Sequence, residues 1–321
     1  MSRLTDRSAW RGVPLRDRLK ALLSSFFVHP QLSHLFAALE QRREMKVLTG
    51  RGVGLLGMAP SGGGKTTFAR YLESVWPRVQ EAERTFVPFV SMEVPSPCTP
   101  STFCNAILKA LGDPNWDVDR IKVQRRRAHD LLRKCGTDVL AIDNVQDIPD
   151  ARGPKGMKLI GNEIRNVIDQ VGVVVLLLGT REARAVLDSN PQLKSRCPGP
   201  LTLCDYDITT REGLASFLRL LNIFDEHLPL AEPSGLGKGA MGWPFALASN
   251  GRMRHVVQML NIAIRLAVDG GRERLTLEDL CNAYRGLFLD GAQVVNPFDP
   301  NFKDWRRLDR VGEPHFELLH G

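Results

Sequence analysis

The sequence predicts an α/β fold with a parallel five-stranded sheet, followed by an all-helical domain. Between residues 47 and 206, short apolar runs alternate with longer amphipathic stretches, which is the pattern of a parallel sheet covered by helices. After Thr209 the helical pattern continues without intervening strands. A glycine-rich sequence that ends in lysine joins the first apolar run to the first long helix of this pattern.

Each predicted element follows from its periodicity. The apolar runs predict strands at Gly54–Met58, Phe86–Val94, Asp138–Ile142, Val171–Leu178 and Pro200–Leu203. The stretches between them predict helices at Thr66–Val75, Thr102–Leu111, Val123–Lys134 and Met157–Gln170. Because sheets built from such units bury both faces, we expect helices on both sides of this one.

The second half of the chain predicts helices at Arg211–Leu221, Met253–Val268 and Thr276–Phe288. Thr209 or Thr210 is a candidate N-cap, and the sequence TLED at Thr276 predicts a capping box with Asp279 in place of the preferred Glu. We therefore expect four parts: a basic helical segment (1–46), an α/β core (47–206), a helical lid (207–290) and a tail (291–321).

Composition narrows the class of protein. Hydrophobic residues make up 43% and charged residues 25% of the 321 residues, which argues against a disordered, fibrous or membrane protein. No apolar run is long enough to span a bilayer, and the six cysteines form no CxxC pair, so we expect reduced thiols and a cytoplasmic location. The net charge of +7 permits a polyanionic partner without requiring one.

The strongest motif is Ala59-Pro-Ser-Gly-Gly-Gly-Lys-Thr-Thr, placed between a strand and a helix as a phosphate-binding P-loop must be. Ala59 stands where the strict motif has its first glycine. We expect Lys65 to contact the β and γ phosphates and the Thr66 hydroxyl to bind Mg²⁺. The predicted cofactors are ATP and Mg²⁺, and the residues expected to hold the nucleotide are Ser61, Gly62, Gly63, Gly64, Lys65, Thr66 and Thr67.

A second acidic motif follows the strand Asp138–Ile142. Asp143 lies at the strand's carboxyl end, where open α/β sheets bind ligands, and we expect it to share the Mg²⁺ with Thr66. The next residue, Asn144, replaces the Glu that activates water in many ATPases of this layout. Because an amide cannot accept the water's proton, we predict slow hydrolysis or a substitute base such as Asp147.

Three further polar residues complete the candidate catalytic set. Thr180 ends the fourth strand and is expected to lie between the acidic strand and the γ phosphate. Arg196, within NPQLKSR, is the candidate arginine finger for a neighbouring subunit, with Lys194 as the weaker candidate. Arg254, within GRMR, is expected to report the nucleotide state from the helical lid, with Arg252 as its competitor.

In this order the motifs resemble the AAA+ superfamily of P-loop NTPases. More narrowly, PSPCTPSTFCNAILKALGDP, VLAIDNVQDI, LLLGTREA and NPQLKSR resemble the TniB/TnsC family of transposition ATPases, over roughly Pro30 to Phe298. The sequence departs from that pattern at Asn144 and Gln146, where relatives typically carry an acidic residue and often a His.

The resemblance implies a regulator of transposition rather than a transposase. Such ATPases oligomerise with ATP on duplex DNA as rings or filaments, a TniQ-like target-selection protein recruits them, and they recruit a DDE-type transposase. CRISPR-associated targeting occurs within such a family, but no residue of this chain indicates it. Two other interpretations stay open: another AAA+ nucleic-acid machine, such as an initiator or helicase loader, and a nucleotide-switched scaffold NTPase that does not bind DNA.

Two basic segments are candidates for sequence-independent contact with the DNA backbone, and each has a solvated helix face as the alternative. One precedes the acidic strand and contains Lys122, Arg125 and Arg126; the other follows it, in an expected Gly-Pro loop, and contains Lys155 and Lys158. Neither is interleaved with aromatic residues, which favours duplex over single-stranded DNA. In the tail, Phe298, Phe302, Trp305 and Phe316 either anchor a partner or fold back onto the protein.

Overall fold

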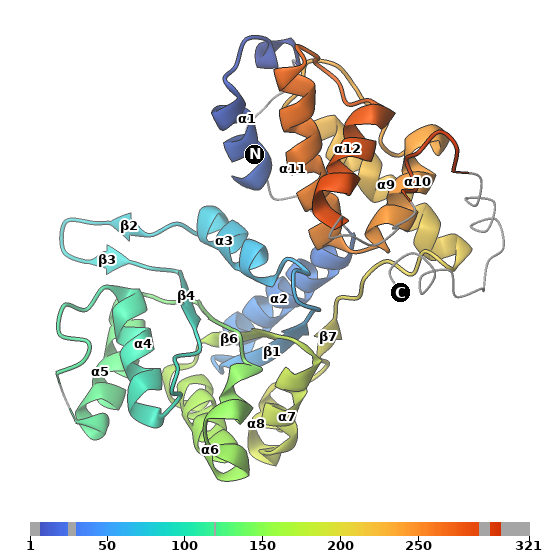
Figure 1. Ribbon diagram of the computed structural model, residues 1–321. Coiled ribbons are helices and arrows are strands. Elements are labelled where there is room, and N and C mark those ends of the chain that lie inside the picture. Colours follow the sequence, from blue (N-terminus) through green and yellow to red (C-terminus); the bar gives the residue numbers. More distant parts are fainter. Residues whose placement is uncertain (1–6, 25–29, 119, 289–295, 303–321) are drawn as a thin grey trace. The chain divides into compact units, whose positions relative to one another are not determined.

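The computed structural model describes residues 7–24, 30–118, 120–288 and 296–302. The chain divides into two compact units, each described here by itself (Figure 1). The α/β unit is Pro30–Leu203. The helical unit combines Met1–His29 with Cys204–Gly321, so two distant parts of the sequence share one core.

The α/β unit contains a five-stranded sheet in the order β4-β5-β6-β1-β7. The strands are β1 (Val53–Met58), β4 (Phe89–Glu93), β5 (Val139–Asp143), β6 (Val174–Gly179) and β7 (Leu201–Thr202). All four pairings are parallel, which confirms the predicted sheet. The strand expected from Phe86 is shorter, because the ladder to β5 begins only after Pro88, which has no backbone N–H to donate. A small hairpin, β2 (Val79–Gln80) with β3 (Thr85–Phe86), precedes it.

Helices flank the sheet, and one glycine permits a close approach. Helix α2 (Pro30–Thr49) packs on β1, where a Cβ on Gly57 would lie 3.1 Å from the buried Leu35 side chain. The remaining helices of the unit are α3 (Lys65–Val75), α4 (Pro100–Leu111), α5 (Ile121–Lys134), α6 (Asp147–Asn166), η2 (Val167–Val171), η3 (Arg181–Ala183), α7 (Arg184–Asp188) and α8 (Pro191–Arg196).

One expectation for this unit is wrong. The segment with Lys155 and Lys158 is not a loop but part of α6, although Pro154 lies inside that helix. Ile148, before the proline, and Ile160, after it, are each 1% exposed, so both ends of the helix are anchored in the core. This packing keeps both parts in one helix although Gly153, with a φ of 62°, is locally irregular.

The helical unit contains η1 (Arg7–Trp10), α1 (Leu15–Ser24), α9 (Arg211–His227), α10 (Gly239–Ser249), α11 (Met253–Asp269) and α12 (Leu277–Phe288). Leu19 and Leu22 of α1 are buried in the same core as the C-terminal helices. The segment expected as one N-terminal part, 1–46, is therefore divided, with α1 in this unit and α2 in the other.

The predicted helix starts in this unit have the expected caps. The Thr210 side chain accepts a hydrogen bond from the backbone N–H of Gly213 at the start of α9. Thr276 and Asp279 form both bonds of the capping box, at 2.9 and 3.2 Å. The aspartate therefore serves where the motif prefers glutamate, because its shorter side chain still reaches the backbone N–H of Thr276.

Phe298 folds back onto the helical unit. Its side chain is buried, and its ring meets Phe245 edge-on, with centroids 5.6 Å apart. The Asn296 amide holds the segment by donating to the carbonyl of Cys281 at 2.9 Å. Of the tail aromatics, Phe302 also packs against this core, whereas Trp305 and Phe316 lie outside the described residues.

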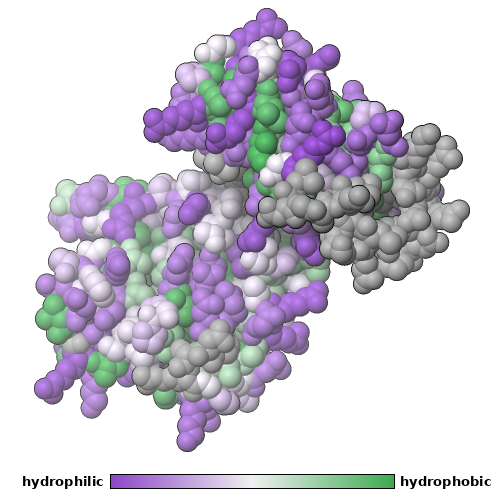
Figure 2. Space-filling view, in the orientation of Figure 1, coloured by the Kyte–Doolittle hydropathy of each residue, from purple (hydrophilic) through white to green (hydrophobic). Residues whose placement is uncertain are grey.

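Hydrophilic side chains cover most of the face shown in Figure 2. Among the described residues, no helix combines the length and apolarity needed to cross a membrane. None of the six cysteines is in a disulfide bond, in agreement with the expected reduced thiols. Burial raises the pKa of Cys104 and of Cys197 to about 12, which keeps these thiols protonated and unreactive.

A buried ion pair anchors α1 in the helical unit. The Arg18 side chain is 3% exposed, and it donates to both carboxylate oxygens of Glu273, at 2.7 and 2.8 Å. Arg18 also donates to the carbonyl of Pro229 at 3.1 Å. The hydrogen bond from Arg18 lowers the pKa of the Glu273 carboxyl. Breaking the pair leaves a buried guanidinium without its counter-ion.

We predict that Glu273→Gln destabilises the protein by about 2 kcal/mol at neutral pH. A carboxylate whose pKa is lowered in the folded state contributes stability above its unfolded pKa of about 4.3, and that stability is lost as the pH falls through the folded value. The difference from wild type should therefore shrink in denaturant titrations toward about pH 3. Glu226→Gln, an exposed change on α9, is the control. An equal difference at both pH values would contradict the ion-pair explanation.

Candidate nucleotide-binding site

Three strand ends meet at one edge of the sheet. Residue Met58 of β1 pairs with Gly179 of β6, and the next backbone N–H, that of Ala59, donates to the Gly179 carbonyl at 2.9 Å. Strand β5 pairs with β6 in the same direction and ends at Asp143. The glycine-rich loop, the acidic residue and Thr180 are therefore brought together, as parallel pairing requires.

The loop depends on its glycines. Gly62 and Gly64 have φ angles of 78° and 84°, in the left-handed region that favours glycine. At Gly63 the constraint is space, since a Cβ would lie 3.0 Å from the Ala59 Cβ and 3.0 Å from the carbonyl oxygen of Pro60. The alanine that replaces the first glycine of the motif thus adds to the crowding that Pro60 imposes at position 63.

Lys65 begins helix α3 and turns back into the loop. Its Nζ donates to the carbonyls of Ala59 and Pro60, both at 2.9 Å, and the residue is 9% exposed. These bonds hold an ammonium group beside backbone that has no Cβ at three successive positions, Gly62 to Gly64. The same donors suit phosphate oxygens, because phosphate is a charged acceptor and the carbonyls are neutral ones.

Thr66 and Asp143 form the candidate metal site. The Thr66 hydroxyl donates to Asp143 Oδ2 at 2.7 Å, and the other oxygen of Asp143 accepts from the backbone N–H of Asn144 at 2.8 Å. Asp143 is 2% exposed, so its carboxylate is held in one orientation. A hydroxyl and a carboxylate in contact fit Mg²⁺, which binds hard oxygen ligands and retains several waters.

Side-chain amides connect Asp143 to the loop after β6. The Oε1 of Gln146 accepts from the backbone N–H of Thr180 at 3.1 Å. Its Nε2 donates to Oδ1 of Asn144 and to Oδ1 of Asp147, each at 3.2 Å. The Thr180 hydroxyl donates to Glu182. The sequence pointed to Gln146 only as a departure from relatives, because its bond to Thr180 joins residues 34 apart.

Arg196 lies away from this edge. Its Nε and Nη2 donate to the two carboxylate oxygens of Asp169, at 3.0 and 3.2 Å, with both side chains about 40% exposed. The next residue, Cys197, packs on Gly54, where a Cβ would lie 2.2 Å from its Sγ. Gly54 is near the start of β1, and the loop follows the end of β1, about 13 Å further along. Lys194 pairs with Asp188 at 2.7 Å.

The other predicted site residues have distinct surroundings. Arg125 forms a two-bond ion pair with the buried Glu163, with Nε 2.8 Å from Oε2. Lys122 and Arg126 are exposed on α5, four residues apart and so on one helix face. Lys155 and Lys158 are exposed on α6. Arg254 is exposed on α11 of the helical unit, and Arg252, which precedes α11, lies 3.8 Å from Asp205.

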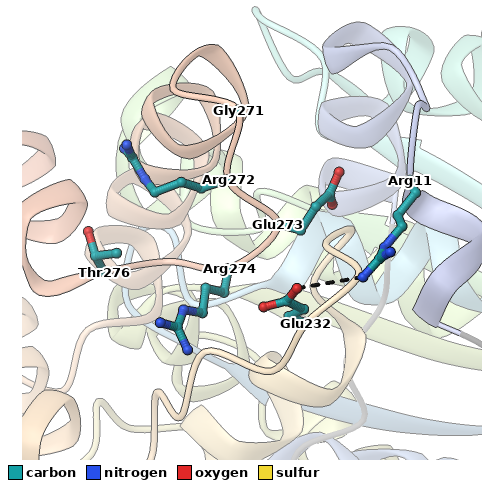
Figure 3. Close-up of a pocket in the computed structure, with 7 residues that line it drawn as sticks. All are labelled: Arg11, Glu232, Gly271, Arg272, Glu273, Arg274 and Thr276. Carbon is teal, nitrogen blue, oxygen red and sulfur yellow. Dashed lines mark ion pairs between the residues drawn. The ribbon is translucent and has the colours of Figure 1, made fainter.

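A separate hollow of about 560 Å³ lies in the helical unit (Figure 3). Its lining mixes charges of both signs, and most of them have partners. Arg11 lies 3.7 Å from Glu232, Glu273 bonds Arg18, and Arg272 bonds Asp279. Three arginines and two glutamates line the hollow, and two of those arginines already face a carboxylate, so its excess of positive charge is small for a phosphate site.

The sheet, the P-loop and the contact between Thr66 and Asp143 define the class of this protein, an AAA+ P-loop ATPase. Solved structures with the same fold include Aeropyrum pernix ORC2 in ADPNP-ADP complexes (16% identity, TM-score 0.56, 80% of this chain and 69% of that one). A. pernix ORC1 in complex with DNA is also similar, with 18% identity and a TM-score of 0.56 over 84% of this chain and 69% of that one. Cdc6p from Pyrobaculum aerophilum has 16% identity and a TM-score of 0.53 over 82% of this chain and 69% of that one. At these identities the likeness concerns the fold.

The family follows from the sequence. The family model described as "Bacterial TniB protein" matches residues 18–200, more than half of the chain. The chain therefore belongs to the TniB family, which agrees with the resemblance drawn from its motifs. No curated protein sequence matches the chain significantly.

We predict that Gly63→Ala lowers ATP affinity by about tenfold, the loss expected when an added methyl group overpacks a tight site. Because Ala59 makes one of the three close contacts and Pro60 the other two, Ala59→Gly in the same chain should restore part of the affinity. Titration with a fluorescent ATP analogue measures both effects. Gly286→Ala, where a Cβ meets nothing within 4 Å, is the control. Wild-type affinity in Gly63→Ala would show that the loop is not this tight.

Proposed function

We propose that this protein is an ATP-dependent, DNA-binding regulator of transposition. It oligomerises on duplex target DNA in the cytoplasm and links a TniQ-like target-selection protein to a DDE-type transposase. The observation that carries the proposal is a P-loop whose Thr66 hydrogen-bonds Asp143 at the end of β5, in a chain of the TniB family.

ATP and Mg²⁺ are the proposed cofactors. Residues 61–67 surround the phosphates, Thr66 and Asp143 hold the metal ion, and the similar ORC2 structure is a complex with ADPNP and ADP. Hydrolysis is slow in this proposal, because Asn144 cannot take the proton of the attacking water. The nearest carboxylate after it is Asp147, which is exposed and accepts from Gln146.

The position of Arg196 supports the proposal that the protein acts as an oligomer. It lies near the start of β1, whereas the phosphate loop follows the end of that strand, so it is too far away to contact the nucleotide of its own chain. An arginine finger in this position acts on the ATP of a neighbouring subunit. The ion pair with Asp169 is exposed and weak, so the guanidinium can exchange it for phosphate. Arg254 is proposed to report the nucleotide state from the helical unit.

Exposed lysines and arginines are the proposed contacts to the DNA backbone. Lys122 with Arg126 on α5, and Lys155 with Lys158 on α6, present positive charge to solvent. Arg125 contributes through its pair with Glu163, which fixes α5 against α6, rather than as a free cation. The similar ORC1 structure is a complex with DNA. When several subunits line one duplex, weak contacts repeat and add.

Electron microscopy of the protein with duplex DNA and a slowly hydrolysed ATP analogue tests the proposal. We expect rings or filaments that enclose DNA in wild type, and none in Lys65→Ala. Arg196→Ala should bind the analogue yet fail to assemble, because only the contact between subunits is lost. Persistent monomers would contradict the proposal, and ATP-dependent assembly without DNA would favour the scaffold alternative. Binding to origin-like DNA alone would favour an initiator.

We predict that Lys122→Ala with Arg126→Ala weakens ATP-dependent DNA binding and lowers the salt slope by roughly two, one for each lost phosphate contact. Fluorescence anisotropy at several salt concentrations gives the slope. Arg51→Ala with Arg84→Ala removes two exposed charges from the same unit and is the control. An unchanged slope in the α5 variant would remove this helix face from the DNA interface.

A further inference from the structure

The orientation of the Asn144 amide follows from one backbone group. A backbone N–H can only donate, so the bond from Thr180 N requires that Gln146 present its oxygen, Oε1, to Thr180. The nitrogen of Gln146 must then face Asn144, and it donates to Oδ1 at 3.2 Å. Oδ1 of Asn144 therefore faces Gln146, and its two Nδ2 donors point away from that bond and make no hydrogen bond to a described residue.

The backbone conformation at Asn144 and the close packing at Gly179 favour this orientation of the two amides. Asn144 has a φ of 59°, a left-handed conformation that asparagine adopts readily and glutamate does not. Gly179 allows Gln146 to approach, since a Cβ at that position would lie 3.0 Å from Oε1 of Gln146 and 2.5 Å from Ala183. The backbone conformation of Asn144 and the absence of a side chain at Gly179 therefore both permit Gln146 to bond Thr180 and Asn144 at once.

We propose that Asn144 recognises the γ-phosphate of ATP through its Nδ2 donors, and that Gln146 is the positioning residue that holds those donors toward the phosphate. The inference rests on the proposed nucleotide site and deepens it. Asn144 directly follows Asp143, at the edge where the phosphate loop lies, and it is half-buried. A phosphate oxygen accepts hydrogen bonds from N–H groups, and its negative charge repels a carboxylate. The Asn144 amide in this orientation can therefore bind the γ-phosphate, whereas a glutamate at this position would be repelled by it.

This arrangement distinguishes ATP from ADP. Both nucleotides would contact residues 61–67, which include Lys65. Only ATP carries the terminal phosphate that Nδ2 would contact. A hydrogen bond to a charged acceptor is stronger than a neutral one, and its loss corresponds to about tenfold in affinity. Asn144 thus sets the preference for the triphosphate, and it does so without acting as a base.

The test is the ratio of affinities for a slowly hydrolysed ATP analogue and for ADP, measured with the full chain and Mg²⁺. Asn144→Gly keeps the left-handed backbone and removes the donor, so the preference for the ATP analogue should fall about tenfold while ADP affinity stays within about twofold. Gln146→Glu keeps the acceptor for Thr180 but turns a second oxygen toward Asn144 Oδ1. That contact is repulsive, so the Asn144 amide should rotate and the ratio should fall similarly.

The double variant separates positioning from direct action. If Gln146 acts through Asn144, then Asn144→Gly with Gln146→Glu should match Asn144→Gly alone. A further fall in the double variant means that the new charge acts directly on the phosphate and overturns the positioning role. Gln80→Glu, the same change on the β2–β3 hairpin, is the control for added charge and should leave the ratio unchanged.

The variant Lys65→Ala distinguishes a failure of the proposed nucleotide site from a failure of the role assigned to Asn144. If it weakens binding of both nucleotides while Asn144→Gly leaves the ratio unchanged, the site stands and the role of Asn144 is overturned. Equal loss of ATP analogue and ADP in Asn144→Gly also overturns that role, because a γ-phosphate contact must act selectively. If Lys65→Ala binds both nucleotides like wild type, the proposed site itself is wrong.

Discussion

The pairing of β1 with β6 is the constraint on which the rest of the site depends. It fixes Met58 opposite Gly179, so the phosphate loop and the Thr180 loop leave the sheet side by side. Since β5 pairs with the other side of β6, Asp143 reaches the same edge and contacts Thr66. In a sheet, a register shift of one residue turns every side chain to the opposite face. Such a shift would separate Asp143 from Thr66 and Gln146 from Thr180 at the same time.

Much of this arrangement could be predicted because the patterns that encode it are local. The apolar runs marked the five strands, and the loop motif marked the edge at which ligands bind. The assignment of α1 to the helical unit was not predictable in this way, because Leu19 and Leu22 show only that the helix has an apolar face. Likewise, nothing near Arg125 revealed that Glu163, far along the chain, would pair with it.

Departures from a motif were the hardest features to interpret from sequence. The motif marks Ala59 as a small replacement, yet its Cβ, together with Pro60, limits the space at position 63. Gly153 and Pro154 predicted a loop by local preference, but buried isoleucines on both sides keep the segment in α6, with only a local irregularity at Gly153. In each case the deciding contact lies outside the window in which a pattern is recognised, so the physical reason becomes visible only when the packing is known.

In the proposed mechanism, the single residue Asn144 affects both the binding of ATP and its hydrolysis. If its amide offers donors to the γ-phosphate, it stabilises the ATP-bound state and, for the same reason, cannot draw a proton from water. Tight recognition and slow hydrolysis are then consequences of one orientation, set by Gln146 and Thr180. A regulator that must stay assembled on DNA until a partner arrives gains from a long-lived ATP state. Hydrolysis would then depend on groups that the partner or a neighbouring Arg196 supplies.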